Sequence, residues 1–444
     1  MTLSRRQFLA TSGALAAASL APSRLLAAVK RHTPPPPRLD DWAAVRAQFR
    51  LDPAQLHFAS FYLASHPTPV RDAIDGFRRA LDANPYLMVE HSMFTSEAAS
   101  LQVKVCEAAA DYIGGRREEV AVTGNTTTGL ALVYHGLMLR PGDEVLTTEH
   151  DHYSHLESIR LATERAGATM RQVALFDDPA QASIGTIVER LRAAIRPATR
   201  ALGITWVHSS SGVRLPLRDI AGAVREANRE RDEKDAVLLI VDGVHGLGAV
   251  DERPADTGID FFCAGTHKWI FAPRGTGIVW GTPAAWARLR PTIPTFSSLE
   301  LFQAWLKGER VTGPTQAWHV APGGFAAYEH QWGAVAAFQF HQQLGRARVA
   351  ARIRDLNDQC KDGLARMPRV RLRTPRDSAL SAGLTCFEVA GKSPDEVVKR
   401  LLERKIVAST SPYRVAYARL APSLVNSRDE VERALAAVRA IAAA

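Results

Sequence analysis

The sequence predicts an α/β protein: a mostly parallel sheet of seven strands between helices, followed by a smaller α+β domain. Two observations lead to this expectation. From about residue 95, short β-rich runs alternate with longer amphipathic runs. Beyond about residue 345, the pattern changes to a long Arg-rich helix, a few short strands and an Ala-rich helix at 427–443. The length of 444 residues is enough for two or three domains.

The first 28 residues have the features of an export signal. A pair of arginines, Arg5 and Arg6, precedes a weakly apolar run that ends near Ala28. The pattern resembles a twin-arginine signal, and the alternative is a chance Arg-Arg pair before a hydrophobic helix. The run is too short and too rich in Ala and Ser for a good membrane span. We therefore expect a signal at 1–28, a Pro-rich linker at 29–40, and export to the periplasm by the twin-arginine translocon without stable membrane insertion.

Charge and cysteine content exclude several classes of protein. The formal charge is +9, and removing the three arginines of the signal leaves +6, with both signs alternating along the remaining chain. No basic stripe interleaved with aromatic residues is present, so we expect no nucleic-acid partner. Four widely spaced cysteines are too few for a disulfide framework or a zinc site, although one bridge remains open. They are Cys106, Cys263, Cys360 and Cys386.

The elements follow in a regular order. A helix capped by Thr95 or Ser96 is expected to stop at Gly114-Gly115. The predicted strands are 119–123, 144–148, 169–175, 201–208, 236–241, 260–264 and 276–281. Between the strands, one predicted helix begins after Asn125, and three others span 153–166, 184–195 and 217–229. We assign 71–310 to a large domain, 311–444 to a crossover and small domain, and 41–70 to a segment packing on the small domain.

Polar residues follow several of these strands, where an open α/β sheet binds its ligand. The first such stretch, 124–129, places Asn, Thr and Gly residues at the start of a helix. Exposed N–H groups and hydroxyls there would suit a phosphate group. The same residues would also serve as an ordinary helix cap.

Two charged residues follow later strands. Asp242 ends the strongest strand, and a carboxylate buried there is costly unless it meets a cation, such as a protonated pyridine nitrogen. Lys268 is one of only nine lysines and lies between a histidine and a tryptophan after another strand. Partial burial would lower its pKa and make it competent to form a Schiff base. The plainer alternatives are a loop-capping Asp and a surface Lys.

Taken together, the Gly/Thr loop, Asp242 with Gly243 and His245, and His267-Lys268-Trp269 resemble the class V aminotransferases. These are fold-type I enzymes that use pyridoxal 5'-phosphate, and the resemblance covers about residues 50 to 440. It implies a fold-type I transferase, an amino-acid-like small-molecule substrate and a homodimer. Relatives also place a Gly-Thr turn near 322–325, but the threonine is missing here, which puts that contact with a neighbouring subunit in doubt.

The resemblance also implies roles for individual residues. Lys268 matches the lysine that forms the Schiff base, and Asp242 matches the partner of the pyridine nitrogen. His150 matches the histidine that stacks on the ring, although His152 and Tyr153 are close alternatives. The remaining matches are cofactor contacts by Thr126, Thr127, Ser209, His245 and His267, and a grip on the substrate carboxylate by Arg419. Arg419 could instead pair with Asp429 or Glu430 at the surface.

The region around Lys268 looks closest to the isopenicillin N epimerase-like and cysteine desulfurase-like branch. Desulfurases need a nucleophilic thiol before the carboxylate-binding arginine, and the stretch 407–413 has no cysteine. The resemblance therefore implies an enzyme acting at Cα of an amino acid or amine, as an epimerase or aminotransferase. The alternatives are a C–S or β-elimination lyase without that cysteine and, less favoured, a non-catalytic binding protein.

Overall fold

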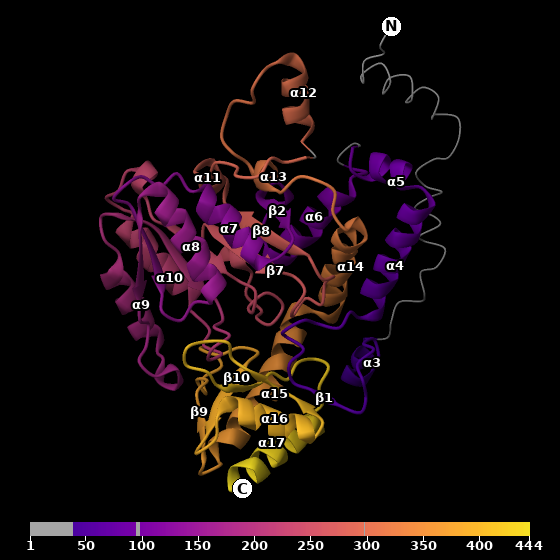
Figure 1. The fold of residues 1–444 in the computed structure, drawn as a ribbon, viewed down its shortest axis with the longest axis vertical. Coiled ribbons are helices and arrows are strands. Elements are labelled where there is room, and N and C mark those ends of the chain that lie inside the picture. Colours follow the sequence, from indigo (N-terminus) through magenta and orange to yellow (C-terminus); the bar gives the residue numbers. More distant parts are fainter. Residues whose placement is uncertain (1–38, 95–97, 297) are drawn as a thin grey trace.

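The computed structural model describes residues 39–94, 98–296 and 298–444 (Figure 1). The expected signal, nearly all of the linker, and the expected caps Thr95 and Ser96 lie outside these residues. The chain forms a central seven-stranded sheet between helices and a smaller C-terminal domain, drawn in orange and yellow below it (Figure 1). The predicted α/β fold with a seven-stranded, mostly parallel sheet is confirmed.

The strand order of the large sheet is β2-β8-β7-β6-β5-β3-β4. Neighbouring strands are parallel except β8, which runs antiparallel to both β2 and β7. The strands are β2 (Val120–Thr123), β3 (Glu144–Thr148), β4 (Thr169–Val173), β5 (Thr199–Thr205), β6 (Leu238–Asp242), β7 (Phe261–Gly265) and β8 (Gly277–Gly281). The parallel arrangement brings the carboxyl ends of β3, β5, β6 and β7 to one edge, where the polar residues of interest follow.

Alternation of side chains divides the core of the large domain into two layers. In β6, Leu239 and Val241 belong to one buried apolar cluster, whereas Leu238 and Ile240 belong to another on the opposite face. Both faces are covered, which explains why this strand is apolar throughout. The covering helices include α6 (Leu101–Ile113), α7 (Thr126–Gly136), α8 (Tyr153–Ala166), α9 (Ile184–Ala194) and α10 (Leu217–Ala227).

Helix α6 begins later than the sequence pattern indicates. Ser100 is its N-cap, and the Ser100 hydroxyl accepts a hydrogen bond from the backbone N–H of Val103. A serine that satisfies an unpaired N–H in this way is a strong helix start. The predicted end is correct, because Gly114 terminates the helix with a left-handed φ of 87°. The sequence reading did not identify α14 (Tyr328–Leu344), which packs against α4 (Thr68–Ala83) and α6.

The small domain has its own apolar core and an antiparallel sheet of order β12-β13-β10-β9. Its strands are β9 (Val370–Leu372), β10 (Thr385–Val389), β12 (Ser409–Thr410) and β13 (Ala418–Leu420). Its helices are α15 (Arg346–Ala365), α16 (Pro394–Glu403) and α17 (Arg428–Ala443). The N-terminal segment contacts this domain: β1 (Leu56–His57) pairs with β11 (Ile406–Val407), and Arg46 forms an ion pair with Glu430.

The remaining helices are α3 (Trp42–Arg46), α5 (Pro85–Ser92), α11 (Pro283–Ala287), α12 (Leu299–Lys307) and α13 (Ala317–Val320). Helix α12 stands out from the large domain at the top of Figure 1. Within the described ranges, none of the helices combines the length and apolar character needed to span a bilayer.

Candidate active site

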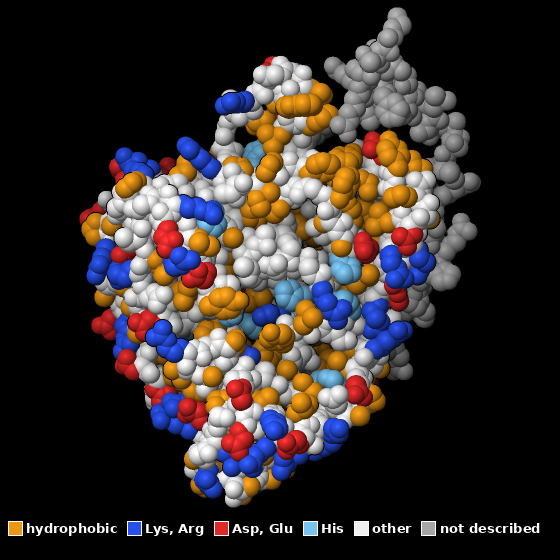
Figure 2. Space-filling view, in the orientation of Figure 1, with side chains coloured by type: hydrophobic (Ala, Val, Ile, Leu, Met, Phe, Trp, Pro, Cys, Tyr) orange, Lys and Arg blue, Asp and Glu red, His pale blue; other side chains and the backbone are white. Residues whose placement is uncertain are grey.

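A cavity of about 220 Å³ lies where the carboxyl edge of the large sheet meets the small domain. Figure 2 shows histidine side chains gathered around a hollow near the middle of the molecule, above the small domain. The lining residues are Phe61, Tyr62, Asn125, Thr126, Thr127, His152, Ser154, Thr205, Ser209, Asp242, Val244, His245, His267, Lys268, Pro412, Tyr413 and Arg419. Eight of the nine residues singled out from the sequence are among them; the exception is His150.

The start of α7 forms one end of the cavity. Asn125 caps the helix, and its side-chain oxygen accepts a hydrogen bond from the N–H of Thr128 at 2.9 Å. The helix supplies no partner for the N–H groups of Thr126 and Thr127, because the first turn has no preceding carbonyls. The Thr126 hydroxyl accepts a hydrogen bond from Gly265 N–H at 2.8 Å, which ties this turn to the end of β7. The turn can therefore present N–H groups to an anion.

Asp242 occupies the end of β6 and is 5% exposed. Its Oδ1 accepts a hydrogen bond from Val244 N–H at 3.0 Å. Burial raises the pKa of this carboxyl group, whereas His155, the Val244 N–H and Lys268 oppose the rise. A buried carboxylate in this position gains most from a cationic partner in the cavity.

Lys268 reaches the same cavity from the loop after β7. Its Nζ lies 3.0 Å from Nε2 of His245, and burial is the main reason that its pKa falls to about 8. Burial, followed by the positive charges of Lys268 and Arg419, holds the pKa of His245 well below its usual value. His245 is therefore neutral at pH 7, and its Nε2 can accept a hydrogen bond that orients the amine.

The lowered pKa of Lys268 predicts a distinctive pH profile. Only the neutral amine attacks an aldehyde, so in ligand-free protein the rate should rise about tenfold per pH unit below pH 8 and level off above it. An ordinary lysine would still gain reactivity up to about pH 10.4. The measurement is trapping of an aldehyde reagent with borohydride, followed by peptide mapping with the exposed Lys307 as the reference. A Lys268 rate that keeps rising beyond pH 9.5, as for an ordinary lysine, would contradict the assignment.

Of the two histidines that follow β3, His152 lines the cavity and His150 lies beside it. His152 lines the cavity, where burial and then the charge of Lys268 lower its pKa to about 4. His150 instead stacks on Phe176 at 3.9 Å, and its Nε2 accepts a hydrogen bond from Leu175 N–H. These contacts hold His150 outside the cavity, and His152, the alternative raised from the sequence, is the one that lines it.

Arg419 lies on β13, is 2% exposed, and contacts three neutral acceptors. Nη1 donates to the carbonyl of Ser209 at 2.8 Å, Nη2 to that of Thr410 at 2.9 Å, and Nε to Ser409 Oγ at 3.1 Å. No carboxylate pairs with it among the described residues, and Glu430 pairs with Arg46 instead. The surface-pairing alternative is therefore wrong. A buried guanidinium without an acidic partner favours an anionic ligand.

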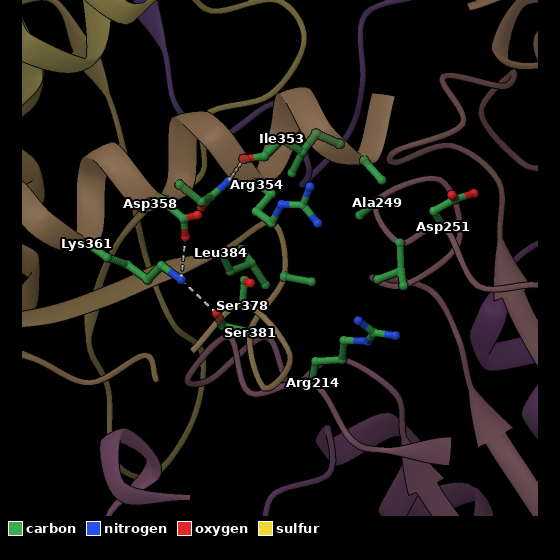
Figure 3. Close-up of a pocket in the computed structure, with 15 residues that line it drawn as sticks. Arg214, Ala249, Asp251, Ile353, Arg354, Asp358, Lys361, Ser378, Ser381 and Leu384 are labelled. Atoms are coloured by element: carbon green, nitrogen blue, oxygen red, sulfur yellow. Dashed lines mark hydrogen bonds and ion pairs between the residues drawn. The ribbon is translucent and has the colours of Figure 1, made fainter. Parts of the chain in front are cut away.

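A second buried lysine, Lys361, lies in a different cavity of about 150 Å³ at the junction of the domains (Figure 3). Its Nζ is within 2.9 Å of Asp358, Ser381 Oγ and the carbonyl of Arg376. Figure 3 shows the amine directed at Asp358 and Ser381. Because all of its donors are engaged, Lys361 has a structural role, unlike Lys268.

Several cavity residues carry no signal in the sequence. Phe61 and Tyr62 come from the N-terminal segment, and the Phe61 ring lies 5.0 Å beneath the guanidinium of Arg419. Tyr413 comes from the small domain, and its hydroxyl lies 2.8 Å from Ser209 Oγ. Thr205 ends β5, beside Asp242 in register, whereas the predicted strand 201–208 placed it inside a strand.

The four cysteines are free, and the structure pairs none of them. None lines the cavity. Burial raises the thiol pKa of each cysteine, to about 12 for both Cys106 and Cys386. Cys386 lies on β10, opposite Arg419 in the ladder. Such thiols are poor nucleophiles.

Comparison with known proteins places this geometry in context. The family model described as "Aminotransferase class-V" matches residues 63–422. Isopenicillin N epimerase of Streptomyces clavuligerus is 25% identical over 420 residues, covering 90% of this chain and 98% of that protein. A probable cysteine desulfurase of Vibrio cholerae is 24% identical, covering 84% and 90%.

Solved structures show the same fold. A structure of C-DES with glycine covalently linked to its PLP cofactor superimposes with a TM-score of 0.75 at 23% identity, covering 89% of this chain and 98% of that chain. The apo cysteine desulfurase of Thermococcus onnurineus also has a TM-score of 0.75, at 19% identity, covering 90% and 98%.

Proposed function

This chain belongs to the class V aminotransferase family, and from that premise we propose that it acts at Cα of an amino acid or amine, as an epimerase or aminotransferase. Its cofactor is pyridoxal 5'-phosphate. The observation that carries the proposal is that Lys268, Asp242 and the unpaired cation of Arg419 meet in one cavity.

The cavity residues fit this cofactor. Thr126 and Thr127 offer N–H groups to its phosphate, and Asp242 offers a carboxylate to its protonated ring nitrogen. His267 and His245 each have a buried Nδ1 without a partner among the described residues, so both retain hydrogen-bonding capacity. Lys268 attaches the cofactor covalently. When bound, the cofactor withdraws electrons from the substrate Cα and weakens its bonds.

The chain's own groups then determine which atoms react. Arg419 binds the substrate carboxylate, because its buried guanidinium lines the cavity and contacts neutral acceptors alone among the described residues. Lys268 removes the proton from Cα and returns it, and its pKa of about 8 suits proton transfer near neutral pH. His245 orients the amine at 3.0 Å. His152 and Tyr413 form part of the cavity wall beside these groups.

The second candidate function is a lyase that eliminates a substituent from Cβ or Cγ. It is supported by the fold shared with C-DES, which a second solved structure describes as a cystine C–S lyase. A desulfurase that forms a persulfide on its own cysteine is disfavoured, because no cysteine lines the cavity and the pKa of each thiol is raised. Retention of Lys268 and Asp242 in the cavity argues against a non-catalytic binding protein.

Incubation of the holoenzyme with a panel of amino acids in heavy water tests the proposal. Deuterium at Cα without keto acid is the result expected of an epimerase, and keto acid formed with cofactor amination is expected of an aminotransferase. Pyruvate with ammonia or sulfide would favour the lyase. If no amino acid of the panel exchanges its α-hydrogen or yields product, the enzymatic proposal is overturned.

Assembly and location are further parts of the proposal. We infer a homodimer from the family, to be checked by light scattering on the purified protein. Export by the twin-arginine pathway rests on Arg5 and Arg6 of the N-terminal sequence. Cell fractionation should find the mature protein in the periplasm, and Lys substitutions of both arginines should retain it in the cytoplasm. Wild-type protein confined to the cytoplasm would contradict export.

A further inference from the structure

The turn that carries Lys268 ends in an unusual backbone conformation. Phe271 has a φ of 60°, although it is not a glycine. This left-handed conformation is unfavourable for a bulky residue, so the surrounding structure must hold it in place. The Phe271 N–H donates to the carbonyl of Lys268 at 3.2 Å and closes the turn. We call residues 268–271 the lysine turn.

Backbone carbonyls in and before the lysine turn have partners from several parts of the chain. The carbonyls of the two residues that precede Lys268 accept hydrogen bonds from the N–H groups of Ala272 at 3.1 Å and Ala64 at 3.0 Å. The Trp269 carbonyl differs, because its partner is a side chain: Nε2 of His341 on α14, at 2.8 Å. A single substitution can therefore remove this partner and leave the backbone hydrogen bonds of the turn intact.

The position of the proton on His341 follows from its two partners. A carbonyl oxygen can only accept, so Nε2 carries the proton that it donates to Trp269. Burial lowers the pKa of His341 to about 4, so the ring is neutral near pH 7 and Nδ1 is an acceptor. The Tyr112 hydroxyl, 3.0 Å from Nδ1, therefore donates to it. Tyr112 on α6 thus fixes the tautomer in which His341 can bind the turn.

Packing reinforces this hydrogen bond. The Phe271 ring is 2% exposed and contacts the rings of Phe49 and His341, with centroid distances of 5.1 and 6.1 Å. Gly248, from the loop after β6, approaches the same peptide group: a Cβ there would lie 2.8 Å from the carbonyl carbon of Trp269 and 2.9 Å from its oxygen. The carbonyl that His341 binds is therefore closely enclosed, and a small shift of the turn would disturb several contacts.

We propose that His341 is a positioning residue for Lys268: together with Tyr112, it holds the lysine turn in the conformation that places the amine beside Nε2 of His245. The Trp269 carbonyl belongs to the residue next to Lys268, so a shift of that peptide group moves the lysine with it. This inference rests on the role of Lys268 in the proposed function. It adds two residues that lie outside the cavity wall and carry no reacting atom.

The test follows the reactivity of Lys268 in ligand-free protein, by trapping acetaldehyde with borohydride and mapping the peptides. His341→Phe keeps an aromatic ring against Phe271 and removes both hydrogen bonds. Burial is the main reason that the pKa of Lys268 is about 8, so loosening the turn should raise the midpoint of the trapping profile by about one unit and lower the rate at pH 7 about tenfold. A lower melting temperature with an unchanged profile would overturn the proposal, because a merely structural role predicts that result.

Three further variants locate the effect. His341→Gln retains a side-chain N–H for the Trp269 carbonyl and should restore most of the wild-type profile. Tyr112→Phe removes only the donor to Nδ1, and it should shift the midpoint in the same direction by less. Lys361→Met, at the domain junction, is the matched control for lost stability and should leave the profile unchanged. Equal shifts in His341→Phe and Lys361→Met would overturn the positioning role. If His341→Phe does not fold, Tyr112→Phe carries the test, and an unshifted midpoint there would overturn the proposal.

Holoenzyme kinetics separate this inference from the proposed function. For the amino acid of the panel with the highest turnover, His341→Phe should lower kcat for α-hydrogen exchange more than it raises KM, because the contacts of Arg419 are untouched. If the wild-type holoenzyme exchanges no amino acid, the proposed function fails. The trapping profile still decides the inference in that case: a shifted midpoint in His341→Phe supports it, and an unshifted one overturns it.

Discussion

Replacing Lys268 by alanine should abolish turnover and covalent cofactor attachment together. A positioned acid–base group contributes about 10²–10⁴ to a rate, so activity should fall at least about a thousandfold once attachment is lost as well. Borohydride treatment followed by peptide mapping should find the cofactor on the peptide containing residue 268 in the wild type and on no peptide in the variant. The pH dependence of aldehyde trapping, centred near 8, should disappear with it.

The matched control is the other buried lysine. Lys361→Met removes an amine that is held by Asp358, Ser381 and the carbonyl of Arg376 at the domain junction (Figure 3). This variant should lower the melting temperature and retain both turnover and attachment. Loss of attachment in Lys361→Met with retention in Lys268→Ala would reverse the assignment of the two lysines.

Replacing Asp242 by asparagine should preserve the fold and remove most of the activity. The amide oxygen can still accept the hydrogen bond from Val244 N–H, so the end of β6 keeps its local structure. The charge that would pair with the cofactor's protonated ring nitrogen is lost. Breaking a buried charge pair costs about 3–5 kcal/mol, which corresponds to about a 10²–10⁴-fold fall in kcat/KM.

The control for Asp242→Asn lies at the opposite edge of the same sheet. Asp260 precedes β7, accepts a hydrogen bond from Leu239 N–H at 2.8 Å, and has a pKa raised by burial to about 6. Asp260→Asn should retain full activity, because this carboxyl group lies outside the catalytic cavity. Equal activity losses in the two variants would indicate that a general effect on the sheet, rather than the ring nitrogen, accounts for Asp242.

Much of the fold was predictable because its signals are local. Seven short β-rich runs, most of them separated by helical segments, correspond to seven strands, and the end of α6 follows from the glycine at 114. The start of α6 was placed too early, since several polar residues upstream could cap a helix and only the structure selects Ser100. Helix α14 was missed because its pattern is weakly amphipathic; it is buried between α4 and α6.

The residues of the candidate site were likewise predictable only in part. Asp242, Lys268, Thr126 and Thr127 were predictable because each lies at the end of a strand or within four residues after it, and parallel strands bring those positions to one edge. Which of His150 and His152 faces the cavity could not be predicted, since both lie on one short loop. Contacts with Leu175 and Phe176, from the loop after β4, decide which ring faces the cavity.

By itself, the sequence determined the order of strands and helices and the chemical groups at the carboxyl edge of the sheet, because periodicity and position after a strand are short-range properties. Only the tertiary structure decided that Arg419 reaches the carbonyl of Ser209, 210 residues away, and that the Tyr413 hydroxyl reaches the hydroxyl of the same serine. Both depend on how the small domain packs against the large one, and that packing results from contacts between segments far apart in the chain.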